Sequence, residues 1–393
     1  MGILSFPHHF ATLGIWAGLA IITFASLACT LTLHFLSRLA SNTDLTSFFA
    51  LGKLAFGQAG QVSAMIAVIL FIFGALIFYL VVAADNLIGF LTFVRPGAVD
   101  VWYASHASVM ILIALLTLPI ACLRDMSALG KASIAGMVCM AYILVLTVGD
   151  WAFKTPSATA PLVVSFGIDT FSRTFSSLLF SFVNHLTVVS VIPALIDPTP
   201  ARRFKATVYP AATIYLFYVL IGVCGYLHFG QEVSNSILES SSDSGALTQW
   251  AYVIGKLMMS AVLILSYPLL VDPCRGTLEG ALGLFFDGKN WWKRTTALRS
   301  LIITFFIVLI SLLIGIFYAD AAEEILGATT ALSGSLIVFI FPAAYFLKMS
   351  HRYKAHWWEF AVAYFCIVFG FYFMVSGTFF SVKKIILSRA GTA

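Results

Sequence analysis

Apolar residues run in continuous stretches of about 20 residues along most of this chain, with short polar segments between them. In a helix, a stretch of that length crosses a hydrocarbon core of about 30 Å. A β-barrel would instead show alternating strands of about ten residues. The pattern therefore predicts membrane-spanning helices at about residues 15–36, 62–93, 106–122, 131–149, 169–196, 206–229, 249–271, 298–318, 325–348 and 357–381.

The first apolar run, from residue 1 to about 12, is shorter and contains Pro7. A turn at Leu13-Gly14 separates it from the span at 15–36. The polar, glycine-containing stretch 41–60 is predicted to be a loop with a short surface helix at about 45–55. We therefore predict ten complete spans plus the second half of another, its first helix truncated at the N-terminal side, in one transmembrane domain covering residues 1–393.

Composition supports a membrane protein, because 61% of the residues are hydrophobic and only 10% are charged, whereas soluble domains average about 25% charged residues. The six cysteines are scattered without C-x-x-C spacing, which indicates small buried side chains rather than a disulfide or metal framework. No segment has the basic, aromatic-interleaved character of a nucleic-acid site. Membrane lipid is therefore an expected partner and nucleic acid is not, while the oligomeric state stays open.

Lysine and arginine predict the orientation of the chain, since they concentrate in the cytosolic loops of membrane proteins. Fifteen of them fall in alternate loops and helix ends on the side that contains the start of the chain, and five fall on the opposite side. The N-terminal side is therefore expected to be cytosolic. No positively charged leader follows Met1, so no signal peptide is expected. The plasma membrane and a vacuolar or lysosomal membrane remain alternatives.

Two spans contain segments that predict interruptions in the helix. Glycine and proline bracket Ser5 in residues 2–7, and Asn184 and His185 lie near the centre of the span at 169–196. Discontinuous membrane helices expose main-chain groups that bind carboxylates and cations. A simple kink is the alternative at the first segment, and a structural hydrogen bond between helices is the alternative at the second. His185 is a candidate for proton coupling because histidine titrates near physiological pH.

Three further sites carry charge within or beside the spans. Asp85 lies toward the outer interface, as a proton carrier or as a solvated helix-end group. Asp169 and Arg173 lie four residues apart, which favours an ion pair on one helix face. Lys256 is expected to extend its ammonium group to the outer surface.

Seven motifs occur in the order found in the amino acid/auxin permease family, and they extend over nearly the whole chain. They are residues 2–10 (GILSFPHHF), 51–57 (LGKLAFG), 73–85 (FGALIFYLVVAAD), 118–127 (LPIACLRDMS), 182–185 (FVNH), 225–230 (GYLHFG) and 267–275 (YPLLVDPCR). Each motif alone is weak, but seven in register are specific. The chain therefore resembles this family, which includes sodium-coupled and proton-coupled transporters of neutral amino acids.

The resemblance implies an all-α, leucine-transporter-like fold of about 11 helices. Its two inverted repeats would cover about residues 1–149 and 169–348, with an extra helix at about 357–381. It places an amino acid between the broken first and sixth helices. The implied substrate-binding residues are Ile3, Leu4, Ser5, Phe73, Ser181, Phe182, Asn184 and His185. Ser266 matches a hydroxyl beside the cation of sodium-coupled relatives, although a hydrogen bond to its own helix is an equal alternative.

The chain departs from the family pattern at three points. The half-helix that precedes the first break is absent from the sequence, Asn184 replaces a cysteine, and Ser190 and Ala194 replace a proline and a glutamate. The changes at Asn184, Ser190 and Ala194 predict an altered pocket or a divergent lineage. The absent half-helix predicts either a clipped gene model or a compromised inner gate.

The leading hypothesis is a secondary active transporter of amino acids, with a neutral amino acid as the expected substrate, coupled to H⁺ or Na⁺. In this hypothesis helices 1, 2, 6 and 7 rock against helices 3, 4, 8 and 9. No cofactor is expected beyond the coupling ion, and no metal site is expected. The alternative is a non-transporting amino acid sensor or scaffold with the same fold. An enzyme is disfavoured because the spans contain no paired carboxylates, H-E-x-x-H motif or nucleophile–base set.

Overall fold

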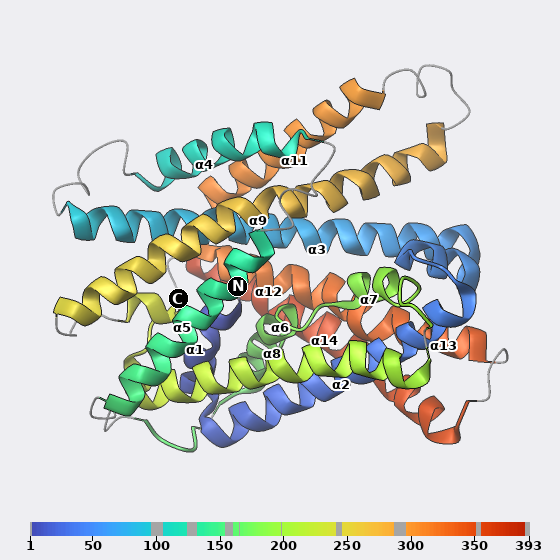
Figure 1. Ribbon diagram of the computed structural model, residues 1–393, viewed down its shortest axis with the longest axis horizontal. Coiled ribbons are helices and arrows are strands. Elements are labelled where there is room, and N and C mark those ends of the chain that lie inside the picture. The colour runs from blue at the N-terminus through green and yellow to red at the C-terminus, as the bar shows by residue number, and fades with distance from the viewer. Residues whose placement is uncertain are drawn as a thin grey trace. The chain divides into compact units, whose positions relative to one another are not determined.

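The computed structural model describes residues 2–95, 105–123, 132–153, 160–164, 166–197, 199–240, 246–286, 296–350 and 355–389, and its regular structure in these ranges is helical (Figure 1). The elements are η1 (Gly2–Ser5), α1 (Phe6–Leu13), α2 (Ile15–Thr43), α3 (Phe48–Val94), α4 (His106–Ala121), α5 (Ala132–Phe153), α6 (Ile168–Phe180), α7 (His185–Val191), α8 (Pro200–Phe229), η5 (Gly230–Glu232), η6 (Ile237–Glu239), α9 (Ala246–Phe286), α11 (Thr296–Phe317), η7 (Ala319–Ala321), α12 (Ala322–Thr329), η8 (Thr330–Gly334), η9 (Leu336–Ile340), α13 (Phe341–Met349) and α14 (Trp357–Arg389).

Within the described ranges, nine helical segments are long and apolar enough to cross a membrane, and α4 is a shorter apolar helix. Together with η1 and α1 they correspond to the ten complete spans and the partial one that the hydropathy pattern predicts. Part of the fourth motif, residues 124–127, and Pro198 lie outside the described residues.

The chain divides into two compact units. Unit 1 consists of Met1–Phe71, Pro156–Val233 and Gly327–Ala393, and unit 2 consists of Ile72–Thr155 and Ser234–Leu326. Each unit therefore draws its helices from segments that lie far apart in the sequence. The predicted single domain with two inverted repeats stays a prediction.

In unit 1, α1 and α2 both pack against α8, and α14 packs against α6 and α13 (Figure 1). Glycines allow α1, α2 and α8 to pack closely. A Cβ on Gly18 of α2 would lie 2.7 Å from the Phe10 ring, and a Cβ on Gly222 of α8 would lie 2.5 Å from it. Phe175 of α6 and Phe373 of α14 have ring centroids 4.1 Å apart. Glycines that admit a large aromatic ring are typical of packed membrane helices.

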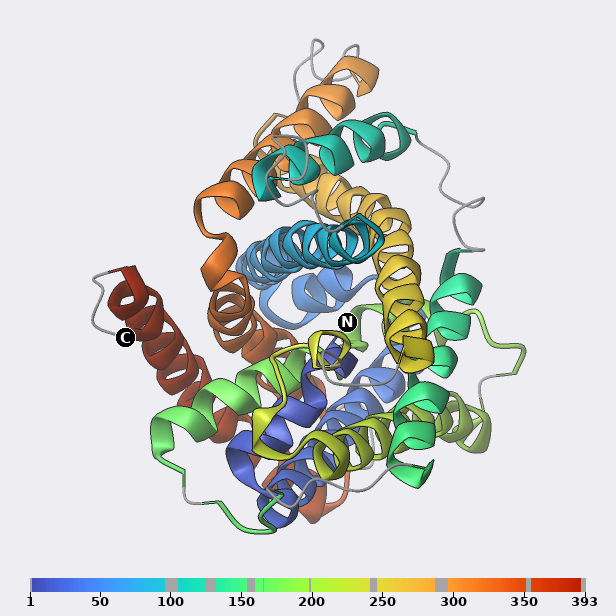
Figure 2. The ribbon, with the colours of Figure 1, turned by 90° about the vertical axis from the view of Figure 1, so that its left-hand side faces the viewer.

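In unit 2, α9 packs against α4, α5 and α11, and Figure 2 shows it in gold beside the green α5. Arg275 of α9 binds the end of α4, because its Nη1 donates to the carbonyl oxygen of Ala121 at 2.9 Å. Tyr267 of α9 and Ser311 of α11 share a buried hydrogen bond of 2.6 Å. These bonds satisfy polar groups inside the unit, as a low-dielectric interior requires.

The short helix predicted at about 45–55 is confirmed, since the first arm of α3 begins at Phe48, but the rest of the stretch 41–60 is less loop-like than predicted, because α2 reaches Thr43 and α3 continues beyond its break. The helix is interrupted at Phe56 and Gly57, where Gly57 has a φ of 67°. The two arms of this interruption pack with backbone in contact, because a Cβ on Gly60 would lie 2.4 Å from the carbonyl oxygen of Gly52. Glycine therefore marks a close helix crossing here rather than a flexible loop.

Candidate functional site

The first span begins with a short 3₁₀ helix rather than a continuous α-helix. η1 covers Gly2–Ser5, and α1 follows with Pro7 in its first turn. Proline is favoured there because it has no N–H to donate and a fixed φ. α1 ends at Gly14, whose φ of 79° and N–H bond of 2.7 Å to the carbonyl of Phe10 form the turn before α2. The predicted turn at Leu13-Gly14 is confirmed.

The sixth span is interrupted, as its polar centre predicts. α6 ends at Phe180, residues 181–184 are not helical, and α7 begins at His185. The N–H groups of Ser181 and Phe182 bond to carbonyls only three residues back, each at 3.0 Å. The side chain of Asn184 does not cap α7. Helices leave their terminal N–H and C=O groups without intrahelical partners, so this break offers main-chain polar groups inside the span.

The two interruptions lie directly against each other. A Cβ on Gly2 would lie 1.7 Å from Oγ and 3.0 Å from Cβ of Ser181, so only a glycine fits with this side chain in place. The side-chain oxygen of Ser181 is buried and has no hydrogen-bond partner among the described residues. The structure thus joins the two segments that the sequence singles out, although 179 positions separate Gly2 from Ser181 (181 − 2).

Tyr218 of α8 connects both interruptions, and the sequence analysis did not identify it. Its hydroxyl donates to the carbonyl oxygen of Ser181 at 3.1 Å. Its ring stacks on Phe6 with centroids 4.4 Å apart and meets Phe182 edge-on at 5.4 Å. The sequence feature that could have pointed to Tyr218 is its phenol hydroxyl within the apolar span at 206–229, since a buried hydroxyl needs a hydrogen-bond partner.

His185 is fully buried at the start of α7. Its Nε2 lies 2.9 Å from Oγ1 of Thr32 on α2. The Thr32 hydroxyl already donates to its own helix, at 3.0 Å to the carbonyl of Cys29 and 3.2 Å to that of Ala28. We therefore assign the proton to Nε2, which donates to Thr32. Nδ1 is then a buried acceptor without a partner in the described chain.

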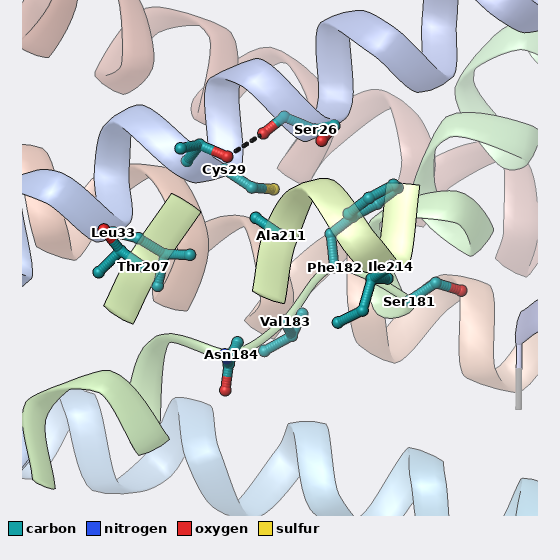
Figure 3. A pocket seen from close by; sticks show the side chains of 11 residues that line it. Ser26, Cys29, Leu33, Ser181, Phe182, Val183, Asn184, Thr207, Ala211 and Ile214 are labelled. Carbon is teal, nitrogen blue, oxygen red and sulfur yellow. Dashed lines mark hydrogen bonds between the residues drawn. The ribbon is translucent and has the colours of Figure 1, made fainter. Parts of the chain in front are cut away.

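A cavity of about 220 Å³ lies between α2, α8 and the break in the sixth span (Figure 3). Figure 3 shows Val183 and Asn184 on the non-helical segment that forms one wall of the cavity, and Ser26, Cys29 and Leu33 of α2 on another wall. The lining residues are Ser26, Cys29, Thr30, Leu33, Ser181, Phe182, Val183, Asn184, Thr207, Ala211 and Ile214.

This cavity includes three of the predicted substrate-binding residues, Ser181, Phe182 and Asn184. Four others do not line it. His185 is buried behind the break, and Ile3, Leu4 and Ser5 are buried within η1. The cavity therefore lies on the α2 and α8 side of the break, and the first-span residues pack on the break itself.

Two predicted site residues belong to unit 2, so they are described with that unit. Phe73 is half-buried on α3. Ser266 is half-buried on α9. In unit 1, Arg173 and Asp169 form the predicted ion pair at 3.7 Å. The assignment of all these residues to a substrate or ion site stays a prediction.

Two solved structures share the fold of this chain. The crystal structure of MhsT in complex with L-phenylalanine matches 99% of this chain and 94% of its own, with a TM-score of 0.54 and 11% sequence identity. The structure of MHP1, a nucleobase-cation-symport-1 family transporter in a closed conformation with bromovinylhydantoin bound, matches 100% of this chain and 89% of its own, with a TM-score of 0.57 and 13% identity. The predicted all-α, leucine-transporter-like fold is confirmed.

The family relationship comes from the sequence rather than from these distant structures. A family model described as transmembrane amino acid transporter protein matches residues 1–383, which is nearly the whole chain. This match confirms the resemblance to the amino acid/auxin permeases that the seven motifs carry. The chain therefore belongs to the transmembrane amino acid transporter family and is a multi-pass membrane transporter, not an enzyme.

Proposed function

We propose that this transporter carries neutral amino acids by alternating access, driven by a gradient of H⁺ or Na⁺. The observation that supports this most is the meeting of the two interrupted spans, where Gly2 lies against Ser181. Two helix breaks at one place bring main-chain N–H and C=O groups together within a membrane protein. Such groups bind the carboxylate and ammonium of a zwitterion without any charged side chain.

The residues of the two breaks favour a neutral substrate. Residues 2–7 and 181–187 contain no Asp, Glu, Lys or Arg. A substrate with a charged side chain would need an opposite charge there, because an unpaired charge inside a membrane protein is costly. Ile3, Leu4 and Phe182 instead offer apolar surface, and Ser181 and Asn184 offer uncharged polar groups.

Two residues are the candidates for ion coupling. The unpartnered Nδ1 of His185 can accept a proton next to the break, and the hydroxyl oxygen of Ser266 is the kind of hard ligand that suits Na⁺. Alternating access is supported by the division of the chain. Unit 1 holds spans 1, 2, 6 and 7 together with spans 10 and 11, and unit 2 holds spans 4, 5, 8 and 9 together with most of span 3. This grouping resembles the moving bundle and the scaffold of the predicted mechanism.

Uptake by purified protein in liposomes tests the proposal. Labelled L-alanine, L-leucine and L-phenylalanine are compared with L-lysine and L-glutamate under an imposed H⁺ gradient, an imposed Na⁺ gradient or neither. We expect accumulation of neutral amino acids with one gradient. H185Q should remove H⁺-driven uptake and S266A should remove Na⁺-driven uptake, so each variant serves as the control for the other. Binding without uptake would instead identify an amino acid sensor, and uptake indifferent to both gradients would refute the coupling.

A further inference from the structure

Unit 2 contains an open pocket of about 330 Å³ that plays no part in the proposed transport site. Three elements form it: the end of α3, the loop element η6 and the first turns of α9. Its lining residues are Gly89, Thr92, Phe93, Glu239, Gln249, Val253 and Lys256. Polar and charged groups that converge beside apolar side chains can fix the orientation of a small molecule.

Two opposite charges line this pocket from different elements. Glu239 comes from η6 and Lys256 from α9, and they form no direct ion pair in the described structure. Partial burial and the Asp85 carboxylate raise the pKa of Glu239, and the nearby Lys256 ammonium opposes that rise. The two charges therefore attract each other electrostatically across the pocket without forming a direct ion pair.

The position of the lysine depends on a glycine. A Cβ on Gly89 would lie 3.1 Å from both Cδ and Nζ of Lys256, so the lysine side chain lies across the bare backbone of α3. The sequence predicts that Lys256 extends its ammonium group to the outer surface, and in the structure its half-buried side chain lies along α3 at the wall of this open pocket. The lack of a side chain at position 89 leaves room for this path.

The other polar groups around the pocket already have partners. Asp85 accepts a hydrogen bond from Nε2 of His106 at 2.6 Å. The Thr92 hydroxyl donates to the carbonyl of Gly89. Phe93 packs edge-on against Trp250 with ring centroids 4.9 Å apart, which supports the apolar wall. Among the described residues that line the pocket, the carboxylate of Glu239 and the ammonium of Lys256 are thus the charged groups available to bind a ligand.

We propose that this pocket binds a small zwitterion, with the ammonium of the ligand at Glu239 and its anionic group at Lys256. A dipolar molecule pairs both charges, whereas a single cation or a single anion pairs only one of them. Free amino acids have this chemistry, and so does the phosphoethanolamine headgroup of a lipid. The pocket lies in unit 2, whereas the interrupted spans lie in unit 1, so it is a second site for zwitterions on the same chain.

Amide hydrogen exchange of the full chain in phosphatidylglycerol nanodiscs, whose headgroup has no ammonium, tests the proposal with glycine as the probe. Glycine should protect amides at residues 237–240 and 249–256, whereas N-acetylglycine, which lacks the ammonium, and glycinamide, which lacks the carboxylate, should not. In a second arm, nanodiscs containing phosphatidylethanolamine are compared without glycine. Protection in that arm identifies the lipid headgroup as the ligand, and protection by glycine identifies a free amino acid.

Variants separate binding from structure. E239Q and K256M should each raise the half-saturating glycine concentration about tenfold, which corresponds to about 1.4 kcal/mol. E232Q, at an exposed glutamate outside the pocket, should not change it. E239K/K256E should retain protection, because both charges remain with their positions exchanged.

Three results would overturn the proposal: no protection of these segments in either arm, equal protection by N-acetylglycine, or unchanged binding in both E239Q and K256M. Exchange at residues 2–6 and 178–187 reports on the interrupted spans in the same experiment. Protection there without protection of the pocket would refute this site alone. The reverse would refute the proposed transport site alone.

Discussion

The hydrogen bond between Thr32 and His185 provides a quantitative test of how the break in the sixth span is held. Thr32→Val replaces the hydroxyl with a methyl group of similar size and removes the acceptor of Nε2–H. The ring is fully buried, and shifting its proton to Nδ1 does not help because Nδ1 has no acceptor in the described structure. The variant therefore leaves an unpaired donor inside the protein.

The expected loss of stability follows from two bounds. A buried group that loses its partner costs about 1–3 kcal/mol. Hydrogen bonds between membrane helices average about 0.6 kcal/mol and reach about 1.7 kcal/mol. Because His185 has no alternative partner, we expect Thr32→Val to lower the free energy of unfolding by about 1.5 kcal/mol.

Thr117→Val is the matched control. Thr117 on α4 is also fully buried, and its hydroxyl likewise donates to carbonyls three and four residues back, at 3.2 Å and 2.9 Å. It has no hydrogen bond to a second helix among the described residues. Its loss should change the free energy of unfolding by less than about 0.5 kcal/mol.

Reversible unfolding in mixed detergent micelles measures these free energies, and a double-mutant cycle with H185F isolates the pair. The cycle should give a coupling energy of about 1 kcal/mol or more. If Thr32→Val costs no more than Thr117→Val, or if the cycle is additive within about 0.5 kcal/mol, the assigned hydrogen bond does not hold the break.

Three further predictions concern other contacts in unit 1. R38M should lower the free energy of unfolding by about 3–5 kcal/mol. The reason is that Glu359, which is only 2% exposed, would lose the ion pair that it forms with Arg38 at 2.5 Å. The double variant R38M/E359L should recover most of this loss, because it leaves no unpaired buried charge. G60A should cost about 3 kcal/mol in the same unfolding assay, since its Cβ would overlap the carbonyl of Gly52. Y218F keeps both ring contacts but loses the hydrogen bond to the Ser181 carbonyl, so it should lower the free energy of unfolding by about 1 kcal/mol in the same assay.

The sequence alone predicts the membrane fold well because the spans depend on local properties. The length of each apolar run places the helices, and Pro7, Gly14 and the Asn184-His185 pair mark where they turn or break. The physical reason is that unpaired backbone and polar side chains are costly within the membrane, so each deviation from an apolar helix is visible in the residues themselves.

The contacts that hold the site could not be predicted in this way. Thr32 and His185 are 153 positions apart, and Arg38 and Glu359 are 321 positions apart. No periodicity or spacing encodes such pairs. Gly60 shows a different limit, because a glycine in a polar stretch has the same appearance in a flexible loop and in a close helix crossing. Only the backbone of its partner, Gly52, distinguishes the two.

The central claim is that the interrupted first and sixth spans meet to form the substrate site, and uptake of a labelled neutral amino acid by G2V in liposomes tests it most directly. A side chain at position 2 would overlap Ser181, whereas G149A adds a methyl group where nothing lies within 4 Å. We predict that G2V lowers uptake by more than about tenfold, that G149A leaves it unchanged, and that the second change in G2V/S181G restores much of the loss by making room. Uptake by G2V equal to that of the unmodified protein would contradict the account.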